Sequence, residues 1–198
     1  MAHILLKKAM KLNYKLTILS LYFLISSFCF AVNHGLEPFQ QNYLDASKNA
    51  SHHCKMGNIY YNEKNYKAAL VEYETAYNLA GGENSSSSSY LYNIAKCLLK
   101  LGHQKAAQKA IKGAIEKDCM NITYYEALAE SYISEGSQNK VLERCLKDYK
   151  NPYNRVLAGL IYIKLGEKKY AKILFDEFIN LYPDLIITQD VKNILKTL

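Results

Sequence analysis

Residues 156–183 read VLAGLIYIKLGEKKYAKILFDEFINLYP, and the spacing of small and large residues in this stretch decides the fold. Gly159 is followed by Tyr162 three residues later, by Gly166 seven residues later and by Ala171 twelve residues later. Phe175 comes four residues after Ala171. Apolar residues at these intervals predict two amphipathic helices that are joined by a tight turn at the glycine.

The same spacing occurs four times along the chain. The residues twelve positions apart are Gly57 and Ala69, Ala95 and Ala107, Ala129 and Val141, and Gly159 and Ala171. The turn position holds Gly102, Gly136 and Gly166 in the last three units, and Lys64 in the first. One helix pair cannot bury its apolar face alone, so self-similarity at this period predicts an all-α array of stacked helix pairs.

The residue types fit close contact between the two helices of a unit. Gly57 and Ala69 allow the helices of the first unit to approach, and Tyr60 and Tyr73 fill the space beside them. In the third unit, Cys145 stands at the position that Tyr73 holds in the first, and it is expected to be a small buried residue.

The units resemble the tetratricopeptide repeat. The first reads Met56-Gly57…Tyr60…Ala69…Tyr73…Ala76, and the fourth reads Ala158-Gly159…Tyr162…Gly166…Ala171…Phe175…Pro183. The resemblance covers about residues 50–183 and implies a right-handed helical-repeat solenoid of about four helix pairs. The expected repeats are residues 50–83, 88–120, 122–150 and 152–183.

The sequence departs from the family pattern in several places. The opening tryptophan is missing, and the units are 38, 34 and 30 residues apart. Gly81-Gly82-Glu83-Asn84 and five serines lengthen the first interval and predict a flexible loop. Val141, Cys145 and Asp148 are poor second-helix residues, so we expect a shortened second helix in the third unit.

Residues 184–198 are expected to form a capping helix that covers the apolar end of the last repeat. They carry an apolar stripe at helical spacing, made of Ile187, Val191, Ile194, Leu195 and Leu198. The alternative is a helix that binds a partner. Residues 32–50 are polar with scattered apolar residues and predict a loop that leads into a short helix.

The first 31 residues have the layout of a secretory signal peptide. Residues 1–15 contain four lysines and no acid, residues 16–30 (LTILSLYFLISSFCF) are apolar, and Cys29-Phe30-Ala31 offers small residues at the positions that signal peptidase contacts. A retained signal anchor is the alternative, and Met10 is an alternative start. Both alternatives predict export, to the periplasm or envelope of a bacterium. Asn49, Asn84 and Asn121 in Asn-x-Ser/Thr sites leave a eukaryotic secretory origin open.

Charge and cysteine content bound the function. The chain carries a net charge of +7, but without residues 1–31 it has 21 basic and 18 acidic residues, a net charge of +3, which does not indicate a nucleic-acid partner. Cys54, Cys97, Cys119 and Cys145 permit disulfides in an exported protein, although no CxxC pair is present.

No catalytic motif and no cofactor motif is found in the sequence. His52 and His53 are adjacent, and on a helix they point about 100° apart, so they cannot chelate one ion as an i, i+4 pair would. We expect no metal site, with His53 filling the large-residue position that opens the first unit. The acids Glu126 and Glu130 lie one helical turn apart, and we expect them to be solvated or to face a ligand.

Repeats of this family hold peptides or partner helices on the concave surface lined by their first helices. By position in each unit, the resemblance implies that this surface includes Asn58, Tyr61, Asn62, Tyr92, Asn93, Lys96, Leu99, Lys100, Glu126, Glu130, Ile133, Leu160 and Ile163. Amide side chains can bond to an extended backbone, and tyrosines add contact area. Asn58 and Asn93 are common in such repeats, so they either contact a ligand or only reflect the fold.

Some family members hold a terminal carboxylate with cations beside two such asparagines. Here Cys54, Thr123 and Ala127 occupy the cation positions, so that clamp is absent in its usual form.

The sequence therefore predicts a non-enzymatic, exported adaptor that binds a protein or peptide and supports assembly of a cell-envelope complex. One alternative is a secreted or surface protein that acts on a host or neighbouring cell. Another is a metal-binding or enzymatic protein that uses residues 52–54.

Overall fold

The computed structural model describes residues 46–81, 86–148 and 150–198. The chain divides into two units, residues 1–46 and residues 47–198, and only the second is described in full helices. The expected signal segment and most of the expected lead-in therefore lie outside the described residues. The lead-in prediction differs from the structure at its end, because residues 46–50 already belong to a helix that runs to residue 62.

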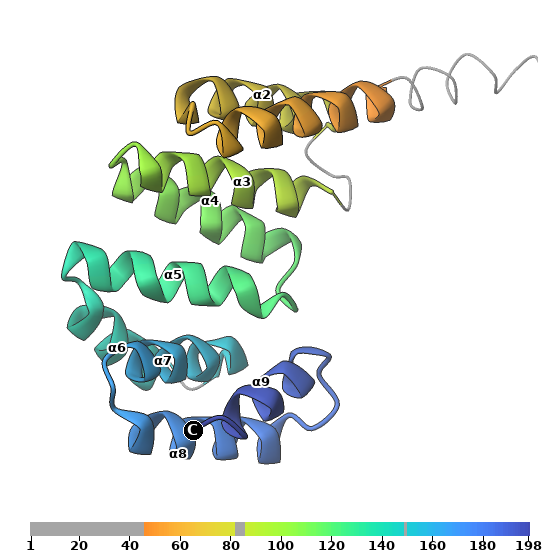
Figure 1. Cartoon of the computed structure of the whole chain (residues 1–198). Helices are drawn as coiled ribbons and strands as arrows, with labels where there is room; N and C mark the ends of the chain where they lie inside the picture. The colour runs from red at the N-terminus through yellow and green to blue at the C-terminus, as the bar shows by residue number, and fades with distance from the viewer. Residues whose placement is uncertain (1–45, 82–85, 149) are drawn as a thin grey trace, which may run out of the picture. The chain divides into compact units, whose positions relative to one another are not determined.

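The second unit consists of helix pairs stacked in chain order (Figure 1). The 46–62 helix pairs with α2, which in turn packs on α3, the first helix of the next pair. The helices that follow 46–62 are α2 (Tyr66–Leu79), α3 (Ser87–Lys100), α4 (Gln104–Lys117), α5 (Ile122–Glu135), α6 (Gln138–Lys147), α7 (Pro152–Lys164), α8 (Lys168–Leu181) and α9 (Ile187–Leu195). The prediction of an all-α helical-repeat fold is confirmed.

Close approach of paired helices depends on a small residue opposite an aromatic ring. A Cβ atom added at Gly57 would lie 2.7 Å from Cε1 of Tyr73, and one at Gly159 would lie 2.3 Å from Cε1 of Phe175. Both rings are buried, with exposed fractions of 1% for Tyr73 and 0% for Phe175. The predicted role of the small residues at the first position of each pair is thus confirmed for the first and last units.

The turns inside the pairs use the left-handed backbone conformation. Gly102, Gly136 and Gly166 have φ angles of 81°, 77° and 81°. Lys64 takes the same role in the first unit with a φ angle of 63°. The amide of Asn65 then donates to the carbonyl of Tyr60 at 2.8 Å, which satisfies a carbonyl at the helix end. A residue with a Cβ atom pays a steric cost in this conformation that glycine does not.

Asparagine side chains begin the first helices of the last two pairs. Asn121 Oδ1 accepts from the amide of Thr123 at 3.1 Å, and Asn151 Oδ1 accepts from the amide of Tyr153 at 3.0 Å. Each bond satisfies one of the free amides at a helix start. Pro152 follows directly, where its missing N–H costs nothing.

The third pair has a short second helix. α6 contains 10 residues, whereas α2, α4 and α8 contain 14 each. This confirms the prediction made from Val141, Cys145 and Asp148. α6 packs mainly against α7 and α5, and its buried residues are Val141, Leu142 and Cys145.

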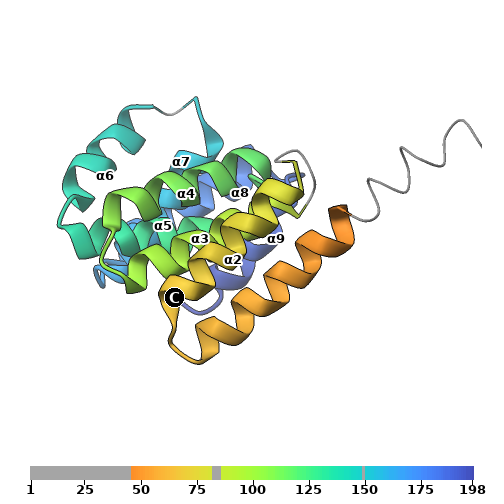
Figure 2. The same cartoon turned by 90° about the horizontal axis from the view of Figure 1, so that it is seen from above.

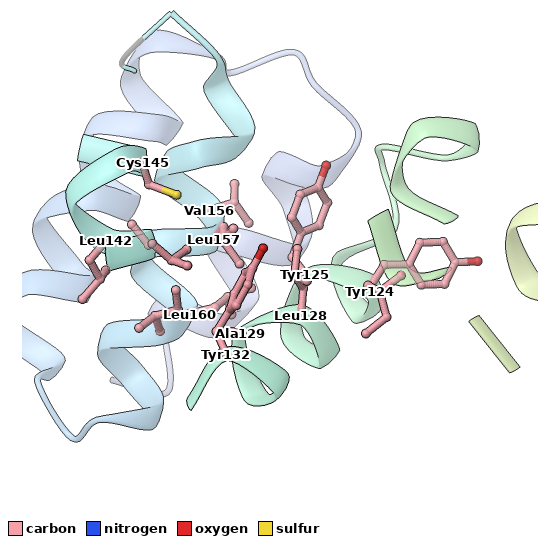
Figure 3. Close-up of a cluster of buried hydrophobic side chains, with 14 of the residues drawn as sticks. Tyr124, Tyr125, Leu128, Ala129, Tyr132, Leu142, Cys145, Val156, Leu157 and Leu160 are labelled. Carbon is pink, nitrogen blue, oxygen red and sulfur yellow. The ribbon is translucent and has the colours of Figure 1, made fainter. Parts of the chain in front are cut away.

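One large buried cluster runs from α3 to α9, and Figure 3 shows its middle section around α5, α6 and α7. Cys145 lies in this cluster with an exposed fraction of 4%, as expected for a small core residue. Two smaller clusters join the first pair to α3, one of them built around Tyr73 and Cys97. The apolar core therefore continues from pair to pair, as a repeat array requires.

The C-terminal helix α9 closes the last pair and also reaches further back. It packs against α8 and contacts α5, and Figure 2 shows the helices from above. Ile187 and Val191 are fully buried, and Ile194, Leu195 and Leu198 pack against the same cluster. The apolar stripe thus faces the core as predicted. Within the described residues, no helix combines the length and apolar character needed to cross a membrane.

Candidate functional site

The first helix of each pair presents half-exposed polar and aromatic side chains, and contacts join them from one pair to the next. We call these residues the first-helix surface: Tyr61 on the 46–62 helix, Tyr92 and Lys96 on α3, Glu126 and Glu130 on α5, and Lys164 on α7.

Lys96 connects the first two pairs. Its Nζ atom lies 4.7 Å from the ring centroid of Tyr61 and 5.7 Å from that of Tyr92. An ammonium group over two aromatic faces is attracted by both ring quadrupoles. Tyr61 also meets Tyr66 edge-on, with the ring centroids 5.3 Å apart. Lys96 is therefore held between two tyrosines and stays half-exposed.

Tyr92 continues the surface toward the third pair. Its ring centroid lies 5.1 Å from that of Tyr124, which is buried in α5. Burial raises the pKa of the Tyr92 hydroxyl, and the nearby Glu126 carboxylate, with Tyr124 and Glu130, raises it further. The two acids of α5 therefore act electrostatically on a tyrosine of α3.

An ion pair joins the third pair to the fourth. Lys164 Nζ on α7 lies 3.2 Å from Glu130 Oε2 on α5. Glu130 is largely exposed, so the pair contributes little to stability and is accessible to a partner. The first-helix surface thus alternates aromatic, basic, acidic and basic groups across all four pairs.

The structure places the predicted asparagines in internal hydrogen bonds. Asn58 Oδ1 accepts from the Tyr73 hydroxyl at 2.7 Å, and Asn93 Oδ1 accepts from Lys96 Nζ at 3.3 Å. Their carbonyl oxygens serve the fold and the position of Lys96, while the amide nitrogens remain for other contacts. Asn62 and Lys100 are exposed near the ends of their helices.

The predicted apolar residues of the surface are less available. Leu99, Ile133 and Ile163 are half-buried and pack against the main cluster. Leu160 is only 4% exposed, which corrects the prediction that it faces a ligand. The physical reason is that Leu160 belongs to the same buried cluster as Ile187 and Val191 of α9. The fourth pair therefore contributes Lys164 rather than Leu160.

Sequence reasoning missed Tyr124 and Tyr66. The Tyr124 hydroxyl donates to Ser88 Oγ at 3.3 Å, which ties α5 to α3 beneath Tyr92. A signal was available, because tyrosine stands five residues before the small residue in two units, at Tyr90 and Tyr124. Both tyrosines are buried, so they position the surface rather than form it.

Residues 52–54 do not form a metal centre in the structure. His53 Nδ1 lies 2.6 Å from Glu72 Oε2, His52 is exposed, and Cys54 is half-buried. In the part of the chain that the structure describes, no three histidine, cysteine or acidic side chains are grouped as metal ligands would be. Cys54, Cys97, Cys119 and Cys145 are all free thiols.

Together, the stacked helix pairs and the surface across their first helices define an α-helical repeat protein. Two family models, both described as tetratricopeptide repeat, match the chain, one over residues 52–82 and 88–116 and the other over residues 153–185. The chain belongs to the tetratricopeptide repeat family. The matched ranges leave out α5 and α6, the pair with the shortened helix.

Solved structures with similar folds include three with tetratricopeptide repeats or related helical arrays. A crystal structure of MamA is 20% identical, and the match covers 69% of this chain and 81% of that chain with a TM-score of 0.46. A tetratricopeptide repeat protein from Parabacteroides merdae is 18% identical, with coverages of 75% and 59% and a TM-score of 0.48. PilF of Pseudomonas aeruginosa is 16% identical, with coverages of 74% and 69% and a TM-score of 0.47. No curated protein matches the chain significantly.

Tetratricopeptide repeats mediate interactions between proteins, and proteins of this family are generally non-enzymatic scaffolds. Membership therefore makes this chain a protein-interaction scaffold, and the first-helix surface is its candidate binding face.

Proposed function

We propose that this protein is an exported adaptor that binds a peptide or partner protein on the first-helix surface and supports assembly of a cell-envelope complex. The observation that carries the binding face is the unbroken set of contacts from Tyr61 through Lys96 and Tyr92 to Glu130 and Lys164. Tyrosines supply contact area at low entropic cost, and the alternating charges can select a complementary partner.

The chemistry of the surface indicates the kind of partner. Lys96 is placed by two rings and by Asn93, so it offers a fixed cation to a carboxylate. Glu126 and Glu130 offer carboxylates about one pair further along to a basic residue. A peptide that fits would carry an acidic residue and a basic residue separated by an apolar stretch.

Site-specific photocrosslinking tests the binding face. A photoreactive residue is placed at position 100, on the exposed end of α3, or at position 172, on the outer side of α8, in otherwise identical chains. Crosslinked partners are compared in intact cells, with and without Tyr61→Ala and Lys96→Glu. We expect a specific partner from position 100 that disappears in the double variant. Equal crosslinking from position 172, or no effect of the double variant, would show that another face binds the partner.

Export is supported by the lysine-rich start, the apolar stretch at residues 16–30 and the small residues Cys29 and Ala31. Cell fractionation with N-terminal mass measurement separates the possibilities. A chain that begins at Val32 in an extracytoplasmic fraction indicates a cleaved signal, and an intact chain in the membrane fraction indicates a retained anchor. An intact chain in the cytoplasmic fraction would refute export.

A further inference from the structure

A second surface lies beside the shortened helix α6, away from the first-helix surface. A cavity of about 810 Å³ is lined by α4, α5, α6 and the residues just after α6. A smaller cavity of about 370 Å³ is lined by α4, α5, Arg144 and the start of α7. Lys112, Tyr132 and Arg144 line both cavities, so the two form one space, which we call the α4–α6 cleft.

The cleft exists because the third pair is incomplete. α6 is four residues shorter than α4, and it packs mainly against α7 and α5. Cys145 replaces the aromatic ring that fills the same position in the first and fourth pairs, Tyr73 and Phe175. The second helices of the third and second pairs therefore leave a space over α5 that a full-length, aromatic-bearing helix would occupy.

The cleft is rich in cations. Five basic side chains line the larger cavity, against the acids Glu135, Glu143 and Asp148; the basic residues are Lys112, Lys140, Arg144, Lys147 and Lys150. Each acid already has a partner. Glu143 pairs with Lys147 at 2.6 Å, Glu135 accepts from Gln108 at 2.8 Å, and Asp148 accepts from Asn154 at 3.1 Å. Among the described residues, Lys112, Lys140, Arg144 and Lys150 have no ion-pair partner.

The floor of the cleft holds an unpaired hydroxyl. Tyr132 is 4% exposed, and Figure 3 shows its ring on α5 pointing toward α6 and α7. Its hydroxyl oxygen is buried and lacks a hydrogen-bond partner among residues 46–81, 86–148 and 150–198. Lys112 Nζ lies 5.6 Å from the centroid of the same ring. A buried hydroxyl without a partner costs free energy, and a bound acceptor would satisfy it.

We propose that the α4–α6 cleft is a second docking site, which takes an acidic segment of a partner protein. Lys140, Arg144 and Lys147 are spaced i, i+4 and i+7 along α6, so the positive charge extends along one side of the cleft. Lys112 provides charge from the opposite helix. A row of cations on two helices matches several carboxylates along a peptide better than one small anion.

The apolar part of the cleft accounts for the other half of the ligand. Ile115, Leu128 and Leu157 line the smaller cavity together with the Tyr125 ring. An apolar side chain of the peptide would enter there, while flanking carboxylates meet Lys112, Arg144 and the Tyr132 hydroxyl. This combination of an apolar anchor and charged neighbours is the usual composition of a binding hot spot.

Fluorescence anisotropy tests the proposal with the purified chain that lacks residues 1–31. The probe is a short fluorescein-labelled peptide that has acidic residues on both sides of a central phenylalanine. The matched peptide has glutamine and asparagine in place of the acids. We expect the acidic peptide to bind, the neutral one to bind at least about tenfold more weakly, and added salt to weaken the binding.

Variants locate the binding. Arg144→Glu and Lys112→Glu lie on different helices, so misfolding of one leaves the other as a test, and circular dichroism reports the fold. Each is expected to weaken binding about tenfold. Lys172→Glu, an exposed change of the same charge on α8, and Lys96→Glu on the first-helix surface are expected to have no effect. Tyr132→Phe removes only the unpaired hydroxyl and is expected to weaken binding about two- to tenfold.

Several results would overturn the proposal. They are absence of binding to the wild-type chain, equal affinity of the neutral peptide, and equal loss of affinity in Lys172→Glu. A single-stranded DNA oligonucleotide or anionic vesicles that bind the cleft as tightly as the peptide would show a general polyanion site instead. Unchanged affinity in Tyr132→Phe would remove the hydroxyl from the site. Because Lys96→Glu is a control here, failure of this site leaves the first-helix surface untouched, and the reverse also holds.

Discussion

Gly159 lies so close to Phe175 that a Cβ atom at position 159 would be 2.3 Å from Cε1 and 2.8 Å from Cδ1 and Cζ of the ring. The ring is fully buried, so it has little room to move. This contact sets the separation of α7 and α8. It is the structural reason for the first small residue of the fourth unit.

Gly159→Ala is expected to destabilise the protein by about 1–3 kcal/mol, because the added methyl group overpacks the α7–α8 contact. The matched control is Gly113→Ala in α4, where the new Cβ would meet only Leu91 Cδ1 at 3.3 Å. A leucine methyl can shift, and alanine favours the helix by up to about 1 kcal/mol, so this variant should be neutral or slightly stabilised. Urea unfolding of both variants checks the difference. Equal effects would mean that the ring does not limit the helix separation.

Lys64→Gly is expected to stabilise the protein by about 0.5–1 kcal/mol. Lys64 holds a φ angle of 63°, where a side chain costs about 1–2 kcal/mol, and glycine regains most of this despite its greater entropy in the unfolded chain. Lys67→Gly makes the same chemical change in the first turn of α2 and should destabilise by up to about 1 kcal/mol. Thermal unfolding of the two variants should move in opposite directions. A loss of stability in Lys64→Gly would contradict the left-handed turn.

Ile187→Ala is expected to cost about 2–4 kcal/mol, since Ile187 is fully buried in the cluster that α9 shares with α5 and α7. The neighbouring Ile186 is 74% exposed, and Ile186→Ala should change stability by less than about 0.5 kcal/mol. Denaturant midpoints measure both. If the two variants were equally stable, α9 would not be docked as described.

The stability of the protein should fall as pH rises from about 9 to about 11, in part through Cys97. Burial raises the pKa of the Cys97 thiol to about 11, while Lys96 lowers it and Glu74 raises it slightly. Below pH 9 the thiol is neutral in both states, and above that only the unfolded chain loses the proton. The unfolded state is therefore favoured increasingly, by up to about 2–3 kcal/mol at the upper end.

Urea unfolding at a series of pH values compares wild type with Cys97→Ala. The variant has a different absolute stability because of the lost side chain, so the slope against pH is the quantity compared. The slope between pH 9 and pH 11 should be smaller in the variant. The same slope in both proteins would show that Cys97 does not titrate in this range.

The repeat fold could be predicted because it depends on local spacing. Gly159, Tyr162, Ala171 and Phe175 specify a helix pair wherever they recur, and the structure pairs the helices accordingly. The short α6 was also predictable, since Cys145 and Asp148 break the second-helix pattern locally.

Features that depend on distant contacts could not be predicted. The burial of Leu160 follows from α9 returning to the cluster around α5, and no residue near position 160 signals it. The contact of Glu130 with Lys164 joins residues 34 positions apart, and each is an ordinary surface charge in sequence. The α4–α6 cleft is likewise a consequence of what a neighbouring helix does not fill.

The ten-residue α6 also makes the array uneven along its length. In a linear array, each pair is stabilised by its own helices and by its nearest neighbours, so a pair with fewer buried residues is the weakest link. We therefore expect backbone amides of residues 138–147 to exchange with deuterium sooner than those of α4 or α8. Under pulling force the chain would yield first at this pair, so that the first two pairs and the last pair separate as two independently folded blocks.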